Sequence, residues 1–383
     1  MTYAGDRTIY DADSHLMELP DFLTAHARSA LHDQLPSLNE VSLAVEGVRM
    51  QELRGHRGHS PDVVQARLAL GDNITKGPKW HDALGAFNGT ERGQALDLLG
   101  FQRQVIFSSF CARKIFEAHP DIRFEAAAAH NRAVAEYCDA DDRLIGVAMV
   151  PLDDVDRAHA EIEAALDLGL GAVWIPSEAP GGRSPGHRDH EKIWATLAER
   201  RVPFILHVGS STLSIEEAWM NDGHSERQSA RGRAEVIGSK DLISIFQTAQ
   251  KFISVLVLDG VLEQFPELRG GIIELGAGWV PDTIRRLDHA TAIWAKSEPH
   301  LARMTRKPSE QFRDQLRFTP YAFEDVGALI RESYPELYMF SSDYPHAEGG
   351  RDPIGRFSRS LADADAATQE RFFAQNFRDL YRC

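Results

Sequence analysis

Short apolar runs alternate with amphipathic stretches along nearly the whole chain. The runs are rich in β-branched and aromatic residues and are nearly continuous rather than alternating with polar positions. They cover residues 8–15, 103–110, 143–151, 171–177, 202–209, 269–276, 315–322 and 336–345. Continuous apolar runs of this length are typical of parallel strands that are buried on both faces. The pattern therefore predicts eight parallel strands.

Helical patterns with recognisable ends lie between the predicted strands. The stretch DDVDRAHAEIEAALDLG begins with acidic residues and ends at Gly169, and HEKIWATLAERR ends in arginines just before Pro203, as helices commonly do. Further helices are predicted over PDTIRRLDHATAIW, EDVGALIRES and AATQERFFAQNFRDLY. Strands that are each followed by a helix favour an α/β protein with the (β/α)8 architecture of a TIM barrel over a doubly wound sheet.

The chain is longer than such a barrel requires. It has 383 residues, whereas the barrel alone needs about 250, so we expect insertions at about residues 18–100 and 210–240. Both stretches follow the ends of predicted strands, and barrel active sites are built from the loops at the C-terminal face of the strands. No repeat or linker divides the sequence, and we therefore predict a single domain over residues 1–383.

Charge and cysteine content exclude several classes of protein. The chain has 42 Lys and Arg against 57 Asp and Glu, a net charge of −15, which argues against a nucleic-acid-binding protein because phosphate contacts need a basic patch. No apolar run approaches the ~20 residues that span a bilayer, and the N-terminal residues do not resemble a secretory signal. We therefore expect a cytoplasmic protein that does not bind membranes. The 3 cysteines form no CxxC pair, so neither a disulfide framework nor a thiolate zinc site is predicted.

Polar side chains of metal-ligand type stand at the ends of three predicted strands. Asp13 and His15 are two residues apart at the end of the first strand and so point to the same face. His207 ends the fifth strand, and Asp343 ends the eighth. Each alone has a structural explanation as a strand-end or turn residue, but together they form a nitrogen and oxygen ligand set that suits zinc, manganese or iron.

Two further residues are candidates for catalysis. Glu274 ends the sixth strand at the same height as the predicted ligands, and His346 follows Asp343 on the next loop. Either Asp343 or Glu274 could accept a proton from a metal-bound water, and His346 could donate one to a leaving group. Alternatively, Glu274 caps a turn or pairs with an arginine, and His346 only fixes its loop.

Candidate substrate contacts are fewer and less specific. Arg54 and Arg57 lie in the cationic stretch LRGHRGH of the first insertion and could bind a substrate carboxylate with bidentate geometry, although a solvated loop face explains them better. Trp174 on the fourth strand could form the wall of an apolar pocket, or pack in the barrel core. No glycine-rich nucleotide motif or serine nucleophile elbow is present.

Several segments, in order, resemble one known superfamily. DADSHLME, PFILHVG, FPELRGGIIELGAGWVPDTIRRLDH, FSSDYPHAEGGRDP and FFAQNFRDLY are similar to the amidohydrolase superfamily. The most similar branch includes aminocarboxymuconate semialdehyde decarboxylase and the γ-resorcylate and 5-carboxyvanillate decarboxylases. The resemblance covers the chain from the first strand to the last helix, but the insertion at about 18–100 contributes little to it.

The resemblance implies a (β/α)8 barrel with a divalent metal at its mouth. Asp13 and His15 match the metal motif of the first strand, His207 matches the histidine of the fifth, and Asp343 matches the aspartate of the eighth. The fourth strand lacks the lysine that binuclear members carboxylate, which implies one metal ion, zinc or manganese. Glu274 stands where the decarboxylases have a histidine.

These features lead to three hypotheses. The first is a mononuclear metal-dependent hydrolase in which metal-bound water attacks a small carboxylated substrate, cyclic or aromatic. The alternative is a metal-dependent, non-oxidative decarboxylase of an aromatic or unsaturated carboxylic acid, because the decarboxylases share the metal site. The third is a barrel that binds metal without catalysis. The resemblance also implies a homodimer.

Overall fold

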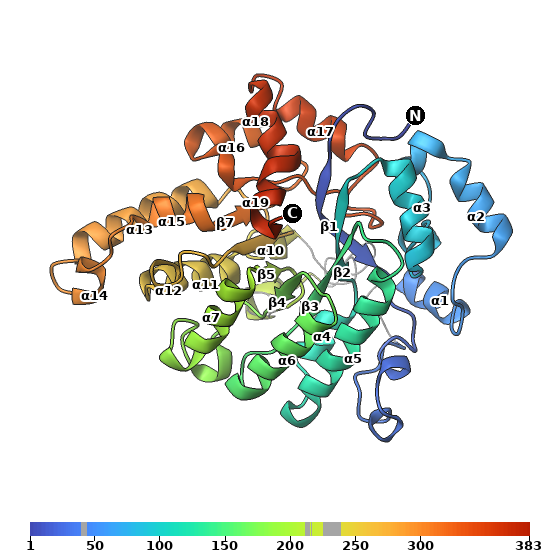
Figure 1. The fold of residues 1–383 in the computed structure, drawn as a ribbon, viewed down its shortest axis with the longest axis horizontal. Helices are drawn as coiled ribbons and strands as arrows, with labels where there is room; N and C mark the ends of the chain where they lie inside the picture. The colour runs from blue at the N-terminus through green and yellow to red at the C-terminus, as the bar shows by residue number, and fades with distance from the viewer. Residues whose placement is uncertain (40–43, 211–214, 216, 225–238) are drawn as a thin grey trace.

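Seven parallel strands form one sheet in chain order in this computed structural model, which describes residues 1–39, 44–210, 215, 217–224 and 239–383. Helices surround the strands (Figure 1), an arrangement that agrees with the predicted α/β class. Each of the first seven predicted strands overlaps an observed one, and the first observed strand ends one residue later than predicted. The observed strands are β1 (Tyr10–Leu16), β2 (Arg103–Ser108), β3 (Leu144–Met149), β4 (Ala172–Trp174), β5 (Phe204–His207), β6 (Gly270–Ile273) and β7 (Leu316–Phe318).

The eighth predicted strand is present only as two isolated parallel bridges. Tyr338 pairs with Phe318 of β7, and Tyr344 pairs with Ser14 of β1, so residues 338–344 lie between the two edges of the sheet. The segment does not form a regular strand because Asp343 has a left-handed backbone with φ of 54°. A backbone of that kind interrupts the extended conformation that a ladder of hydrogen bonds requires.

The helices of the barrel region follow the predicted pattern closely. The predicted helices correspond to α6 (Val155–Asp167), α7 (Glu191–Arg200), α13 (Val280–Trp294), α16 (Val326–Glu332), and the pair α18 (Ala366–Glu370) and α19 (Asn376–Tyr381). In α6, the Asp154 side chain accepts hydrogen bonds from two backbone N–H groups of the first turn, as N-cap residues do. The remaining helices in this region are α4 (Cys111–Phe116), α5 (Pro120–Cys138), α10 (Ser239–Leu242), α11 (Gln247–Leu258), α12 (Val261–Gln264), α14 (Pro299–Ala302), α15 (Pro308–Gln315) and α17 (Pro353–Ser360).

The interior of the sheet is filled with side chains, and α19 closes one end of it. Phe377 and Leu380 of α19 belong to the same buried cluster as inward-facing strand residues such as Val105 and Ile273. The Phe377 ring lies 5.1 Å from that of Tyr10 on β1. In Figure 1 the C-terminus accordingly lies near the centre of the ring of helices. A functional site can therefore open only at the opposite end, where the strands have their carboxyl ends.

The first predicted insertion folds into short helices. These are α1 (Ala44–Glu52), α2 (Pro61–Leu68) and α3 (Gly89–Leu99), together with several single 3-10 turns. Buried histidine–glutamate pairs fasten them: His59 Nδ1 lies 2.6 Å from Glu91 Oε2, and His81 Nδ1 lies 2.9 Å from Glu46 Oε2. These pairs therefore join the described parts of this segment to one another.

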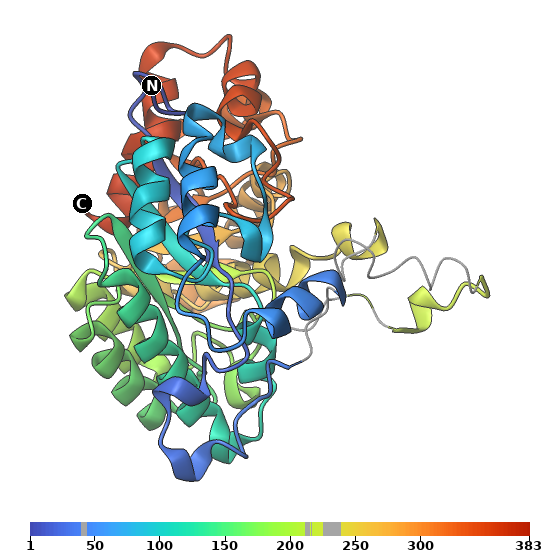
Figure 2. The ribbon, with the colours of Figure 1, turned by 90° about the vertical axis from the view of Figure 1, so that its right-hand side faces the viewer.

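The second predicted insertion, at about 210–240, lies largely outside the described residues. Its described part carries α8 (Glu217–Met220). Figure 2 shows α8 and α1 extending toward the same side of the molecule, away from the C-terminus. Both therefore border the open end of the sheet.

One segment, Ser239–Leu258, is long and apolar enough to cross a membrane by length and composition alone. A buried core helix passes the same test. Within the segment, α11 places Ala249, Phe252, Ile253 and Leu256 in the main hydrophobic core, which is how a core helix behaves.

Candidate metal centre

Two histidines and two carboxylates from three strands converge at the open end of the sheet. Asp13 and His15 come from β1, His207 ends β5, and Glu274 follows β6. Asp13 Oδ1 lies 3.3 Å from Nε2 of both histidines, and Glu274 Oε2 lies 3.7 Å from His15 Nε2 and 3.4 Å from His207 Nε2. The four ligand atoms all lie within 4.8 Å of one another. We call these four residues the ligand cluster.

Backbone carbonyls orient both imidazoles toward this cluster. His15 Nδ1 lies 3.3 Å from the Ser108 carbonyl oxygen, and His207 Nδ1 lies 2.9 Å from that of Val208. A carbonyl can only accept a hydrogen bond, so each Nδ1 carries the proton and donates it. In the neutral imidazole, Nε2 is then the lone-pair donor, and in both residues it faces the carboxylates, which is the usual arrangement of metal-binding histidines.

A second group of residues shares His15. Asp343 Oδ1 lies 3.5 Å from His15 Nε2 and 3.1 Å from His346 Nδ1. The other ring nitrogen of His346 lies 2.8 Å from the Ser109 hydroxyl oxygen, and that hydroxyl donates to the Leu16 carbonyl at 2.8 Å. Asp343 is therefore held between the ligand cluster and a histidine that is itself fixed by β1 and the end of β2.

Both carboxylates on the open side of the cluster have an unusual backbone. Glu274 and Asp343 have φ of 53° and 54°, in the left-handed region, which side chains other than glycine adopt only at a cost of about 1 kcal/mol or more. Surrounding hydrogen bonds impose these conformations. The Glu274 N–H donates to Thr319 Oγ1 at 2.9 Å, and the Asp343 N–H donates to the Asp13 carbonyl at 2.9 Å. Strain that is held in place in this way is typical of functional sites.

Burial and mutual proximity shift the pKa values of the cluster. Burial raises the pKa of Asp343 to about 8, and burial lowers the pKa of His346 to about 3. For Asp13, burial acts to raise the pKa, but the neighbouring His207 and His15 outweigh it and lower the pKa below its usual range. For His15, burial acts to lower the pKa, and hydrogen bonds with Asp13 and Glu274 raise it well above its usual value. The acidic and basic groups are thus strongly coupled to one another.

The donor set fits a divalent metal ion. His15 Nε2 and Asp343 Oδ1 are buried atoms that make no regular hydrogen bond, although buried polar atoms nearly always do; their nearest polar contacts are ion-pair distances of 3.1 to 3.7 Å. Three carboxylates and two imidazoles converge on these atoms, and burying several negative charges together is costly without a cation. Neutral imidazole and carboxylate ligands without thiolate suit zinc or manganese.

Aromatic side chains support the histidines from behind. The His207 ring lies 4.3 Å from Phe107 and 4.7 Å from Trp174, measured between ring centroids. His346 stacks on His15 at 4.0 Å, and Trp80 lies 4.5 Å from His346. These contacts restrict how far the imidazoles can rotate and keep the ligand atoms in position.

Two cavities open at this end of the sheet. One, of about 240 Å³, is bordered by Asp13, Glu274 and Asp343 and by the aromatic rings of Tyr321 and Phe323.

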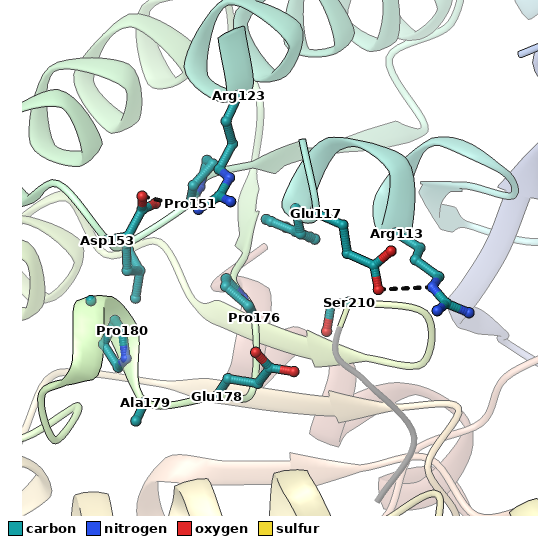
Figure 3. A pocket seen from close by; sticks show the side chains of 13 residues that line it. Arg113, Glu117, Arg123, Pro151, Asp153, Pro176, Glu178, Ala179, Pro180 and Ser210 are labelled. Carbon is teal, nitrogen blue, oxygen red and sulfur yellow. Dashed lines mark hydrogen bonds and ion pairs between the residues drawn. The ribbon is translucent and has the colours of Figure 1, made fainter. Parts of the chain in front are cut away.

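The other cavity, of about 120 Å³, lies beyond the ends of β3, β4 and β5 and contains no member of the ligand cluster (Figure 3). Its arginines are already paired: Arg113 contacts Glu117 and Arg123 contacts Asp153, each at 2.9 Å. The larger cavity is therefore the one that serves the cluster.

The structure brings some of the predicted site residues together and places others elsewhere. It brings together Asp13, His15, His207, Asp343, Glu274 and His346. Arg54 and Arg57 are exposed, and Arg54 donates to Gln51 while Arg57 pairs with Asp21 at 3.4 Å. Trp174 is 1% exposed and lies against His207. None of these three lines either cavity, so their contact with a substrate stays a prediction.

The sequence pattern did not identify the groups that support β1. Arg92 of α3 is fully buried and donates to Gln104 at 3.0 Å and to the His15 carbonyl. Gln104 donates to Asp11 at 2.7 Å, and Asp11 also accepts the Ser342 hydroxyl at 2.6 Å. This network joins β1, β2 and the segment before Asp343. In the sequence, only the spacing of Asp11 and Asp13 along the first strand could have suggested part of this network.

Comparisons with known proteins identify the family of the chain and structures of similar fold. The sequence profile of the family described as amidohydrolase matches residues 108–383. No curated protein sequence matches the chain.

Three solved structures are similar in fold. An amidohydrolase from Mycobacterium avium subsp. paratuberculosis K-10 has 21% identity and a TM-score of 0.71 over 98% of this chain and 99% of that chain. A 5-carboxyvanillate decarboxylase from Sphingomonas paucimobilis has 16% identity and a TM-score of 0.62 over 98% and 99%. A dihydroxybenzoic acid decarboxylase from Polaromonas sp. JS666, with bound manganese and the inhibitor 2-nitroresorcinol, has 17% identity and a TM-score of 0.61 over 98% and 97%. The family match spans most of the sequence and includes His207, Glu274 and Asp343, and the chain belongs to the amidohydrolase family.

Proposed function

We propose that the protein is a metal-dependent, non-oxidative decarboxylase of an aromatic carboxylic acid. The observation that carries this proposal is the convergence of the buried atoms His15 Nε2 and Asp343 Oδ1, which make no regular hydrogen bond, on a cluster that borders a cavity with aromatic walls. The similarity in fold to metal-dependent decarboxylases of aromatic acids supports it. It favours the decarboxylase alternative over the hydrolase that the sequence first suggested.

The ligand cluster would hold one divalent ion, zinc or manganese, through Asp13, His15, His207 and Glu274. When bound, such an ion supplies a Lewis acid that orients the substrate carboxylate and stabilises developing negative charge. Glu274 is included because its carboxylate faces both imidazole nitrogens. Of His15 and His207, Asp343 contacts only His15, and it also pairs with His346.

Asp343 would donate the proton that the reaction requires, and His346 would position Asp343. In a decarboxylation the bond between the ring carbon and the carboxylate carbon breaks, carbon dioxide leaves, and the electron pair stays on the ring carbon. That carbon must then receive a proton. Asp343 borders the cavity and is held by His346, which Ser109 fixes in turn. Asp343 can therefore deliver a proton at a defined position, as general acids do.

A hydrolase remains the second candidate, and Glu274 is the residue that favours it. The decarboxylase branch has a histidine at this position, whereas this chain has a carboxylate that lies beside the ligand atoms. A carboxylate there can accept a proton from an attacking water molecule. The two reactions differ in product, because only hydrolysis adds water to the substrate.

Product analysis distinguishes the two candidates. The protein loaded with manganese is incubated with 2,6-dihydroxybenzoate and 5-carboxyvanillate, which carry the chemistry of the similar enzymes, and with a panel of aromatic esters and lactones. We expect carbon dioxide release with formation of the arene from the acids. Asp343→Asn provides the control for a reaction at this site. Turnover of the esters or lactones alone, without carbon dioxide, would overturn the decarboxylase proposal.

We further infer that residues 338–344 complete a (β/α)8 barrel and that residues 1–383 form one domain with insertions at its mouth. The bridges of residues 338–344 to both β1 and β7 support the first inference. A homodimer and a cytoplasmic location stay predictions from the sequence.

A further inference from the structure

The cavity beside the ligand cluster has a cationic side chain in its wall. Asp13, Glu274 and Asp343 border one part of this 240 Å³ space, and Arg356 of α17 borders another. A cavity of about 150 Å³ holds a benzene ring, so the space accommodates a substituted aromatic ring. A ligand that fills it extends from the cluster toward the arginine.

A glycine makes room for the Arg356 guanidinium. A Cβ atom at Gly350 would lie 2.9 Å from Arg356 Nη1 and 3.0 Å from Cζ and Nη2. Contacts that short are rare, so a side chain at position 350 would require the guanidinium to shift from its place. Gly350 also has φ of 75°, which other residues adopt only with strain. The turn therefore seats the guanidinium against bare backbone.

Arg356 has no carboxylate partner within the part of the chain that the structure describes. None of the ion pairs or side-chain hydrogen bonds found there involves its guanidinium, and Glu348, which also borders the cavity, does not come within 4.0 Å. On the same helix, Arg359 pairs with Asp352 at 3.5 Å. A guanidinium on a cavity wall in a chain of net charge −15 that lacks such a pair is available to an anionic ligand.

The same cavity also has a wall that is suited to an aromatic ring. Tyr321 and Phe323 stack with centroids 5.2 Å apart and an interplanar angle of 21°, and both border the cavity. Phe323 is 73% exposed. Since a large exposed aromatic side chain beside a cavity loses unfavourable contact with water when a ring covers it, this pair offers an apolar surface for the substrate.

We propose that Arg356 binds a second carboxylate of the substrate, so that the preferred substrate class is an aromatic dicarboxylic acid. The inference rests on the proposed function for the first carboxylate, which the ligand cluster would receive. Arg356 fixes which carboxylate reacts, because a bidentate guanidinium–carboxylate pair holds the other one at the cavity wall. Arg356 is thus a specificity-determining residue rather than a participant in the chemistry.

Calorimetric titration tests this proposal without relying on turnover. The probes are benzoate and benzene-1,3-dicarboxylate, titrated into manganese-loaded protein. Charged hydrogen bonds contribute about 1.5–3 kcal/mol, so Arg356→Met is expected to weaken dicarboxylate binding about 10- to 100-fold and benzoate binding less than about twofold. Arg356→Lys keeps the charge without the bidentate geometry and should be intermediate. Arg359→Met removes an equal charge from the same helix and should leave both affinities unchanged.

Three outcomes overturn the proposal. In the first, wild-type protein binds the dicarboxylate no more tightly than benzoate. In the second, Arg356→Met weakens the binding of both probes equally, and in the third, Arg359→Met weakens dicarboxylate binding as much as Arg356→Met does. Thermal unfolding of each variant confirms that it is folded. Selective loss of dicarboxylate binding without any decarboxylation of either probe would support the Arg356 site and count against the proposed reaction. Decarboxylation of a probe by protein that does not prefer the dicarboxylate would support the proposed reaction and count against the Arg356 site.

Discussion

Replacing Glu274 by glutamine tests which carboxylate completes the metal site. Glu274 Oε2 lies within 3.7 Å of both imidazole Nε2 atoms, whereas Asp343 contacts only that of His15. Loss of a residue that merely orients a ligand weakens metal binding about 10- to 100-fold. Since glutamine removes the negative charge of a residue inside the cluster, we expect Glu274→Gln to weaken manganese binding by at least about 100-fold.

The size of this loss can be read as a change in thermal stability. Metal at about 1,000 times its dissociation constant stabilises the folded state by about 4 kcal/mol, and at about 10 times by about 1.4 kcal/mol. The unfolding entropy of 383 residues is about 0.8 kcal/mol per degree, from ~2.1 cal/mol/K per residue. Saturating manganese should therefore raise the Tm of the wild-type protein by about 5 °C and that of Glu274→Gln, at the same metal concentration, by about 2 °C.

The assay is scanning calorimetry with and without chelator, together with elemental analysis of dialysed protein. Asp343→Asn is the matched control, because it also replaces a carboxylate by its amide, at a position beside the ligand cluster, and should keep both the metal and the 5 °C shift. The reasoning fails if Glu274→Gln retains stoichiometric metal while Asp343→Asn loses it. That result would make Asp343 the fourth ligand, as the superfamily resemblance implies.

Three further predictions concern the reaction, pH and packing. Asp343→Asn should lower kcat about 10²- to 10⁴-fold, the usual contribution of a general acid, with unchanged metal content, and retained activity would refute its role. Burial lowers the pKa of His130 to about 4 from its usual 6.5, so the folded state binds the proton less well than the unfolded state. The contribution of His130 to the free energy of unfolding should be fully present above pH 6.5 and should fall by about 3 kcal/mol between pH 6.5 and 4. Urea unfolding measures this pH dependence, and His130→Gln should flatten it. Phe377→Ala should cost about 3–5 kcal/mol in the same assay without altering metal binding, because Phe377 is 1% exposed in the closed end of the sheet.

Much of the fold could be predicted because the signals are local. Parallel strands buried on both faces must be apolar along their length, so each of the first seven runs overlaps a strand. In the eighth run the structure has two isolated bridges and no strand. The backbone of Asp343 depends on its hydrogen bond to Asp13, which lies 330 positions earlier in the chain, and no local pattern reports it.

Asp13, His15 and His207 could also be identified from the sequence as candidate ligands, since the ends of parallel strands meet at one edge of a sheet. The direction of the Glu274 side chain was not, because its left-handed backbone is imposed by Thr319 on the neighbouring strand end. Sequence alone could not separate a carboxylate that faces the imidazoles from one that caps a turn.

The choice among arginines depended entirely on tertiary structure. The sequence drew attention to Arg54 and Arg57 because they are adjacent in a cationic stretch, yet both have partners at the surface. Arg356 carries no local signal, and only the packing of α17 against Gly350 brings its guanidinium to the cavity. The sequence by itself determined the strands and the chemistry of their ends, because burial and alternation act over a few residues. The tertiary structure decided which charges remain without partners around the cavity, because pairing depends on contacts between segments that are distant in the chain.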